Sequence, residues 1–151
     1  YQKACDHNDI MQADAFCLST VSNSGYPHSR ILLMRKMMDE KFYFFTNYKS
    51  SKASDISFCD KVAINFFWDP LGYQVRILGH AKKASSQISD DYYASRPRGS
   101  QLSAWASHQS HEVESREVLL KQVEEVDLKS VRNGKEIFAQ PVSQIAEIFG
   151  N

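Results

Sequence analysis

The chain has 151 residues and a mass of 17.3 kDa, which suits one domain over residues 1–151. With 42% apolar and 12% aromatic residues it can bury a sizeable core, so the composition excludes a disordered chain. Its 18 basic and 18 acidic side chains cancel. That balance argues against a nucleic-acid or anionic-membrane binder, since such proteins depend on excess Lys and Arg.

Strand-like alternation of apolar and polar residues dominates the first half of the chain. We expect strands at residues 16–22, 28–37, 42–46, 61–68 and 73–83, with turns at 23–25 and 69–72. The strand at 28–37 is apolar on both faces, so we expect both faces to be covered. A last strand is expected within 136–149, after an Asn133-Gly134 turn.

Helical patterns lie between and after these strands, at residues 50–58, 86–95, 101–107 and 112–126. The helix at 86–95 should end before Pro97, because the residue before proline avoids the α region. Ser110 is expected to cap the helix at 112–126. The sequence therefore predicts an α+β chain with a mostly antiparallel sheet, and a closed barrel is the economical way to hide the edges of its strands.

Several features bear on the compartment. No apolar run approaches the roughly 20 residues that a bilayer-spanning helix needs, so we expect no membrane partner. No signal peptide opens the chain, although it starts at Tyr1 rather than Met, which indicates that the natural start is missing. Cys5, Cys17 and Cys59 form no CxxC pair, so we expect small core residues in a reducing, cytoplasmic setting.

The common nucleotide and metal motifs do not explain the chain. Its six glycines never form GxGxxG, and no GK[ST] loop occurs. His108, His111 and Glu112 have the spacing of a helical metal site. Two histidines at a helix start, however, are more typical of the polar residues that open a helix. We therefore expect no metal.

Two groups of cationic and hydroxyl residues point to phosphate instead. Arg30 and Arg35 bracket an apolar strand, and Lys52 follows two serines at a helix start, where oxyanions bind readily. A second group is Tyr92, Arg96 and Ser100. Each group alone also fits a solvated surface patch. Together they favour a phosphorylated cofactor and a phosphorylated substrate.

These residues fall in segments that resemble the pyridoxine (pyridoxamine) 5′-phosphate oxidase family. The segments are Arg30-Ile-Leu-Leu-Met-Arg35, Phe-Phe-Thr-Asn47, Ser-Ser-Lys-Ala53, Phe-Phe-Trp68, Gln74-Val-Arg76, Gly79 and the stretch from Tyr92-Tyr-Ala-Ser-Arg96 to Gln109-Ser110. The similarity is continuous from about Thr20 to Ser110, with the right order and spacing.

The resemblance implies a split β-barrel homodimer that binds FMN at the subunit interface. Arg30 and Lys52 would hold the FMN phosphate, and Gln74 would address the ring system. The other cofactor-binding residues implied are Ile31, Leu32, Leu33, Met34, Arg35, Phe45 and Thr46, with Gln109 and Ser110 from the other subunit. The phosphate of the substrate would be gripped by Arg35, Tyr92, Arg96 and Ser100.

The implied activity is FMN-dependent oxidation of pyridoxine or pyridoxamine 5′-phosphate to pyridoxal 5′-phosphate, with O2 as acceptor. Two alternatives stay open. One is a related split-barrel flavoprotein with another substrate, such as a phenazine-pathway oxidase or a flavin reductase. The other is a non-catalytic FMN- or pyridoxal-phosphate-binding protein. The intact Tyr92, Arg96 and Ser100 group favours the B6 substrates.

Three departures from the family pattern stand beside the resemblance. Arg35 replaces the usual Lys, and Ser51 stands where the family has Arg. The Trp-Gly-Gly segment and the Arg-Leu-His-Asp-Arg-like motif of the family are absent, so either these segments are missing or the site is incomplete. We still expect a homodimer, because apolar strand faces such as Phe66 and Trp68 exceed what one small barrel covers.

Overall fold

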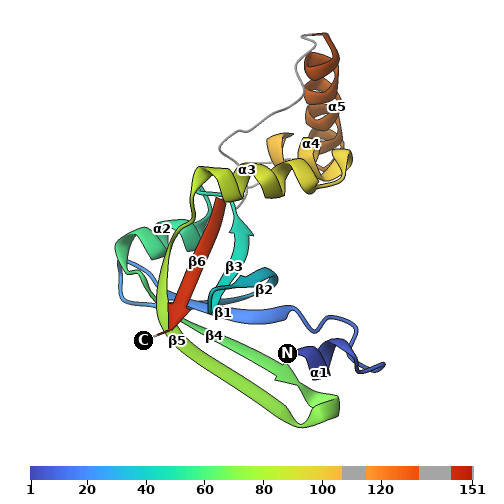
Figure 1. The fold of residues 1–151 in the computed structure, drawn as a ribbon. Coiled ribbons are helices and arrows are strands. Elements are labelled where there is room, and N and C mark those ends of the chain that lie inside the picture. The colour runs from blue at the N-terminus through green and yellow to red at the C-terminus, as the bar shows by residue number, and fades with distance from the viewer. Residues whose placement is uncertain (107–114, 133–143, 151) are drawn as a thin grey trace.

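The computed structural model describes residues 1–106, 115–132 and 144–150, and its centre is a closed barrel of six strands (Figure 1). The strands are β1 (Ala15–Val21), β2 (Pro27–Met38), β3 (Lys41–Thr46), β4 (Lys61–Trp68), β5 (Tyr73–Lys83) and β6 (Gln144–Gly150). They run round the barrel as β1-β2-β3-β6-β5-β4, and every neighbouring pair is antiparallel. The predicted class, an α+β fold with an antiparallel barrel, is confirmed.

Residues with positive φ form the tight connections between strands. Gly25, with φ 84°, lies in the β1–β2 connection, and Gly72, with φ 61°, ends the short turn η1 (Asp69–Leu71) between β4 and β5. Both turns were predicted. The β2–β3 hairpin instead uses Asp39 and Glu40, with φ of 53° and 59°, where a two-residue turn needs the left-handed region.

Aromatic side chains fill the barrel. The Phe16 ring lies 5.9 Å from that of Phe44 and 5.5 Å from that of Phe66. The indole Nε1 of Trp68 donates to the carbonyl of Ala13 at 3.1 Å. Phe66 and Trp68 are both buried inside this one barrel, so the prediction that they exceed its capacity is wrong. Their alternation along β4 places them on the inner face.

The exposed apolar surface lies on the outer face of the same strands. Ile31, Phe67 and Leu78 are 67%, 61% and 73% exposed. β2 is therefore not covered on its outer face by the described parts of the chain, against the prediction of two covered faces. Cys17 of this face is half-buried, as is Cys59, whereas Cys5 is exposed rather than a core residue.

The helices surround the barrel unevenly. They are α1 (Gln2–Cys5), α2 (Ser51–Phe58), α3 (Ser86–Ser95), α4 (Arg98–Ala106) and α5 (Arg116–Arg132). α2 packs against β1, α3 touches β6, and α4 packs against α5. Figure 1 shows α3 lying across one end of the barrel, with α4 and α5 extending beyond it.

Helix boundaries differ from the predictions at two places. The helix expected at 101–107 begins earlier, at Arg98, and the helix expected at 112–126 runs from Arg116 to Arg132. Ser115, not Ser110, precedes the long helix, and its hydroxyl accepts the Val118 N–H at 3.3 Å. Ser110 and residues 112–114 lie outside the described residues. α1 was not predicted. No helix in the described ranges is long and apolar enough to span a membrane.

Candidate functional site

Arg30 on β2 lies close to helix α2 and keeps part of its guanidinium available. Its Nη1 donates to the hydroxyl of Thr20 at 2.7 Å and to the carbonyl of Leu18 at 3.4 Å. Its Nη2 lies 3.6 Å from the carboxylate of Asp55. An arginine has five N–H donors, so Nε and Nη2 can still donate to a further acceptor.

Lys52 is a buried cation in the same place. The residue is only 8% exposed, and no hydrogen bond or ion pair joins its ammonium group to another described residue. Burial lowers the pKa of Lys52, and the positive charge of Arg30 lowers it further. Two neighbouring cations, one of them on a largely buried side chain with no counter-ion among the described residues, are suited to an anionic group. We call these two residues the Arg30–Lys52 cluster.

The start of α2 adds donors to this cluster. Ser50 precedes the helix, but its hydroxyl shares a hydrogen bond with that of Thr46 at 3.0 Å and does not cap the helix. The first N–H groups of a helix lack partners within the helix, so they favour an anion. Ser51 is exposed at the first helical position. The donor set of two cations and a helix start fits a phosphate group.

Asp55 connects the cluster to two strands, and the sequence analysis missed it. Its Oδ2 accepts from the hydroxyl of Thr20 at 2.7 Å and pairs with Nδ1 of His28 at 2.9 Å. Burial alone raises the pKa of Asp55, but the hydrogen bonds from Thr20 and His28 and the charges of His28 and Arg30 outweigh it. The net result is a lowered pKa, so the carboxylate is ionised at neutral pH.

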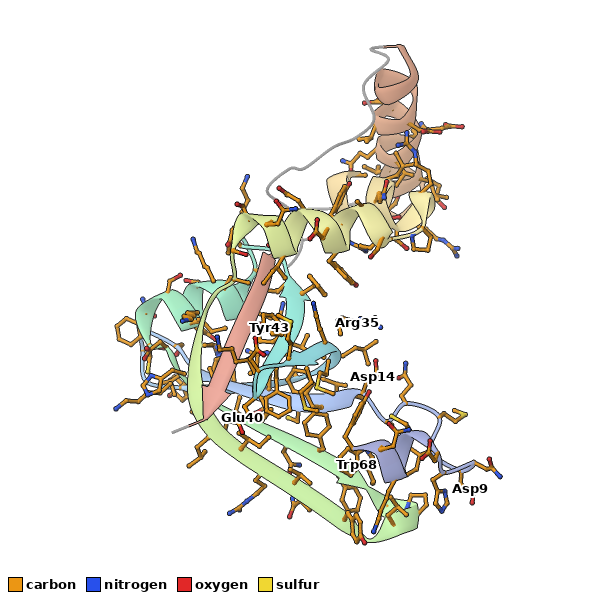
Figure 2. The ribbon with its side chains drawn as sticks, in the orientation of Figure 1. Asp9, Asp14, Arg35, Glu40, Tyr43 and Trp68 are labelled. Atoms are coloured by element: carbon orange, nitrogen blue, oxygen red, sulfur yellow. The ribbon has the colours of Figure 1, made fainter. Side chains whose placement is uncertain are left out.

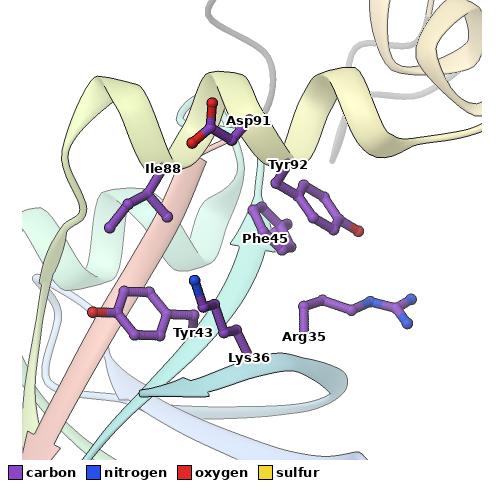
Figure 3. A pocket seen from close by; sticks show the side chains of 7 residues that line it. All are labelled: Arg35, Lys36, Tyr43, Phe45, Ile88, Asp91 and Tyr92. Carbon is purple, nitrogen blue, oxygen red and sulfur yellow. The ribbon is translucent and has the colours of Figure 1, made fainter. Parts of the chain in front are cut away.

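A second cationic site is an open pocket of about 220 Å³ between the barrel and α3 (Figure 3). We call it the α3 pocket, and its lining residues are Arg35, Lys36, Tyr43, Phe45, Ile88, Asp91 and Tyr92. The rings of Phe45 and Tyr92 stack with their centroids 3.1 Å apart and their planes within 7°. Nη1 of Arg35 lies 3.6 Å from the carboxylate of Asp14. Figure 2 labels both side chains. The structure thus brings together Arg35, Phe45 and Tyr92.

A β-bulge explains why two consecutive cations, Arg35 and Lys36, line this pocket. Met34 pairs with Phe44 and Lys36 pairs with Tyr43, so Arg35 is an extra residue in β2. An extra residue breaks the alternation of faces and re-aims the side chains that follow. Lys36 therefore joins the side of the sheet that carries Tyr43, next to Arg35. No turn residue or glycine marks the bulge in the sequence, so the analysis of the sequence did not include Lys36.

Arg96 and Ser100 do not line the α3 pocket. Both are half-buried at the corner between α3 and α4, and Arg96 ends α3 one turn after Tyr92. The corner is held by Gln101, whose Nε2 donates to the carbonyls of Arg96 at 2.9 Å and Tyr93 at 3.1 Å. Gln101 was not predicted. Its glutamine side chain within a Ser100-Gln-Leu sequence gives no signal of this role.

The residues expected to line a flavin are spread over both faces of the sheet. Ile31 is exposed on the outer face, Leu32 and Leu33 are half-buried, and Met34 is buried in the core. Thr46 is buried, and Gln74 is exposed on β5 opposite Phe67. Gln109 and Ser110 lie outside the described residues, as do His108, His111 and Glu112. Within the described ranges, no group of His, Cys, Asp or Glu could hold a metal ion.

A family model described as pyridoxamine 5′-phosphate oxidase matches residues 7–130. The chain belongs to this family. Among curated relatives, it is 43% identical over 122 residues to pyridoxine/pyridoxamine 5′-phosphate oxidase 2 of Hydrogenovibrio crunogenus, covering 81% of the chain. It is 48% identical over 109 residues, or 72% of the chain, to the pyridoxine/pyridoxamine 5′-phosphate oxidase of Pseudomonas putida strain W619. The chain spans about half the length of these relatives, 57% and 51%.

Two solved structures share the fold of this chain. PhzG from Burkholderia lata, crystallised with tetrahydrophenazine-1-carboxylic acid, has a TM-score of 0.81 at 22% identity, covering 91% of this chain and 66% of that one. A related FMN-binding protein from Nostoc punctiforme has a TM-score of 0.75 at 16% identity, covering 99% and 78%. At these identities the likeness shows the fold alone.

Proposed function

We propose that the chain carries the cofactor and substrate sites of an FMN-dependent oxidase. The enzyme would convert pyridoxine or pyridoxamine 5′-phosphate to pyridoxal 5′-phosphate with O2 as acceptor. The observation that carries the proposal is the presence of two separate cationic sites served by one strand, β2. A phosphorylated cofactor and a phosphorylated substrate need one such site each.

The Arg30–Lys52 cluster is the proposed site for the FMN phosphate. It supplies two cations and the start of α2, and Lys52 has no counter-ion among the described residues. Ile31, Leu32, Leu33, Met34, Arg35, Phe45, Thr46 and Gln74 are proposed flavin contacts. Gln109 and Ser110 are proposed to come from a second subunit.

The α3 pocket is the proposed site for the substrate. Arg35 and Tyr92 line it, and Arg96 and Ser100, which follow Tyr92 round the α3–α4 corner, are proposed to add their donors. FMN, when bound, would supply the acceptor for a hydride from C4′ of the substrate and pass the electrons to O2, giving hydrogen peroxide. With pyridoxamine 5′-phosphate, water would then replace the amine nitrogen, which would leave as ammonia. The contribution of the protein is to fix the phosphate and orient the pyridine ring.

A homodimer completes the proposal. The outer sheet face exposes Ile31, Phe67 and Leu78, and apolar patches of this kind mark interaction sites. The side-chain oxygen of Asn65, on a neighbouring strand of the same face, is buried without a hydrogen-bond partner among the described residues, so it adds no donor or acceptor to this outer patch. Sedimentation should give a dimer. A 17 kDa monomer that binds FMN stoichiometrically would contradict this part.

The activity test combines spectroscopy and turnover. Purified protein should show flavin absorbance bands, and it should form pyridoxal 5′-phosphate and hydrogen peroxide from pyridoxine 5′-phosphate but hardly from unphosphorylated pyridoxine. Flavin bands without turnover of either B6 phosphate would indicate a binding protein. Turnover of a phenazine precursor or of free flavin, in place of the B6 phosphates, would assign a different substrate. Either result would overturn the proposed reaction.

A further inference from the structure

Asp55 lies where electrostatics alone would disfavour a carboxylate. The proposed partner of the Arg30–Lys52 cluster is a phosphate, and a nearby negative charge repels it. The residue is nevertheless 6% exposed and is fixed by two strands, through Thr20 on β1 and His28 on β2. A buried charge held by this many contacts is costly to place, so it needs a structural or functional reason.

The contacts show that Asp55 and Thr20 together orient Arg30. The single hydroxyl hydrogen of Thr20 goes to Asp55 at 2.7 Å, so the Thr20 oxygen is left to accept from Nη1 of Arg30 at 2.7 Å. Nη2 of Arg30 lies 3.6 Å from the same Asp55 oxygen. The guanidinium is thus held along one edge, which leaves Nε and part of Nη2 to face a ligand.

We propose that Asp55, acting through Thr20, is a positioning residue that presets Arg30 to bind the phosphate of the flavin cofactor. This rests on the proposed function, because it takes the Arg30–Lys52 cluster as the phosphate site. Preorganisation raises affinity by removing the cost of ordering a flexible side chain on binding. Asp55 also offsets part of the charge of Arg30 when no anion is bound.

The two effects of Asp55 predict opposite results, which makes the proposal testable. If only charge mattered, Asp55→Asn would strengthen FMN binding, because a negative charge near the phosphate is removed. If positioning dominates, Asp55→Asn weakens FMN binding despite the more favourable field. We expect a loss of about tenfold in FMN affinity. Riboflavin, which lacks the phosphate, should bind the variant as it binds the wild type.

The experiment titrates FMN and riboflavin into the flavin-free full chain and follows flavin fluorescence. Asp60→Asn is the matched control, because Asp60 also pairs with a histidine, His80, at 3.0 Å, but on an exposed surface. It should change neither affinity. Thr20→Val and Thr20→Ser form a second pair, should Asp55→Asn fail to fold. Valine keeps the shape and the Asp55 charge but loses the hydroxyl, so FMN affinity should fall, whereas serine should preserve it.

The outcomes separate the positioning role of Asp55 from the proposed phosphate site at the Arg30–Lys52 cluster. Wild-type protein that binds FMN no better than riboflavin would remove the phosphate site itself, and the role of Asp55 with it. In a second outcome, the wild type binds FMN more tightly than riboflavin, but Asp55→Asn and Thr20→Val bind FMN as tightly as the wild type or more tightly. This result would keep the phosphate site and overturn the positioning role of Asp55. An equal loss for both flavins would show that Asp55 only joins α2 to the barrel, which also overturns it.

Discussion

Arg30 and Arg35 lie on the same strand, yet the first points toward a buried network and the second lines an open pocket. Arg30 is held by Thr20 and Asp55, both buried. Arg35 has one ion pair, with Asp14 at 3.6 Å, and its side chain is 41% exposed. A fixed arginine suits a ligand that stays bound, and a lightly held one suits a ligand that must arrive and leave.

The backbone produces this difference. Arg30 pairs with Leu18 in the regular part of the β1–β2 ladder, and its side chain starts on the inner face of the sheet. Arg35, in contrast, is the extra residue of the bulge. A regular strand lets neighbouring elements enclose a side chain. A bulge turns the side chain toward the surface, here under α3. Four substitutions test this division between a cofactor site and a substrate site.

Arg96→Ala should give the largest effect and test the substrate side. It should raise KM for pyridoxine 5′-phosphate. The activation free energy that corresponds to kcat/KM should rise by about 2–4 kcal/mol, because a charge-assisted, bidentate contact is lost. FMN content should stay near wild type. Steady-state kinetics and flavin absorbance measure the two. Protein that purified colourless, with intact substrate affinity after FMN was resupplied, would reverse the division of the sites.

Lys52→Met tests the cofactor side. FMN binding should weaken roughly ten- to hundredfold through loss of a charge-assisted contact. The flavin-free protein should be at least as stable as wild type, since a largely buried lysine with no counter-ion among the described residues is replaced by an apolar chain of similar length. Fluorescence titration and calorimetry report the two quantities. An unchanged FMN dissociation constant would refute the assignment of Lys52.

Asp55→Asn should change how stability depends on pH. Because folding lowers the pKa of Asp55, its carboxylate stabilises the fold above the usual value of about 3.9 and loses this effect as pH falls through the lowered value. The variant should therefore lose about 1–3 kcal/mol at pH 7 and show a flatter decline below about pH 4. Urea unfolding across pH 2.5–7 measures this. Parallel curves for the two proteins would contradict it.

Asp14→Asn should have the smallest effect, on Arg35. Removing a partly exposed ion pair costs under about 1 kcal/mol, but it also removes a carboxylate that competes with an anionic substrate. We expect KM for pyridoxine 5′-phosphate to fall by up to about fivefold at low salt, and by less at high salt. A KM that rises would show that Asp14 positions Arg35 as Asp55 is proposed to position Arg30.

The barrel was predictable from the sequence because its strands alternate in phase with the core. Phe16 and Leu18 on β1, and Ile64 and Phe66 on β4, repeat every second residue, and the structure buries all four. Alternation alone does not show which face of a strand is the inner one. The expectation that Phe66 and Trp68 exceed the barrel is wrong for this reason.

The site was less predictable, because its key contacts depend on register. Asp55 in a short helix is typical of a solvated face, and its partners Thr20 and His28 lie 35 and 27 residues away. One signal was available. Thr20 follows Phe16 and Leu18 at every second position and so lies on the inner face of β1, where a polar side chain needs a hydrogen-bond partner. The bulge at Arg35 had no such signal.

Strand β6 has a consequence for how the molecule is made. It is the last of the described strands in sequence, yet it pairs with both β3 and β5, between which it closes the ring. On the ribosome, those two strands emerge long before their shared partner and present unpaired edges in the meantime. Slow, long-range closure of this kind exposes a nascent chain to mispairing. A β6 donated by a neighbouring molecule would satisfy the same edges, so strand exchange competes with correct closure until residues 144–150 have been synthesised.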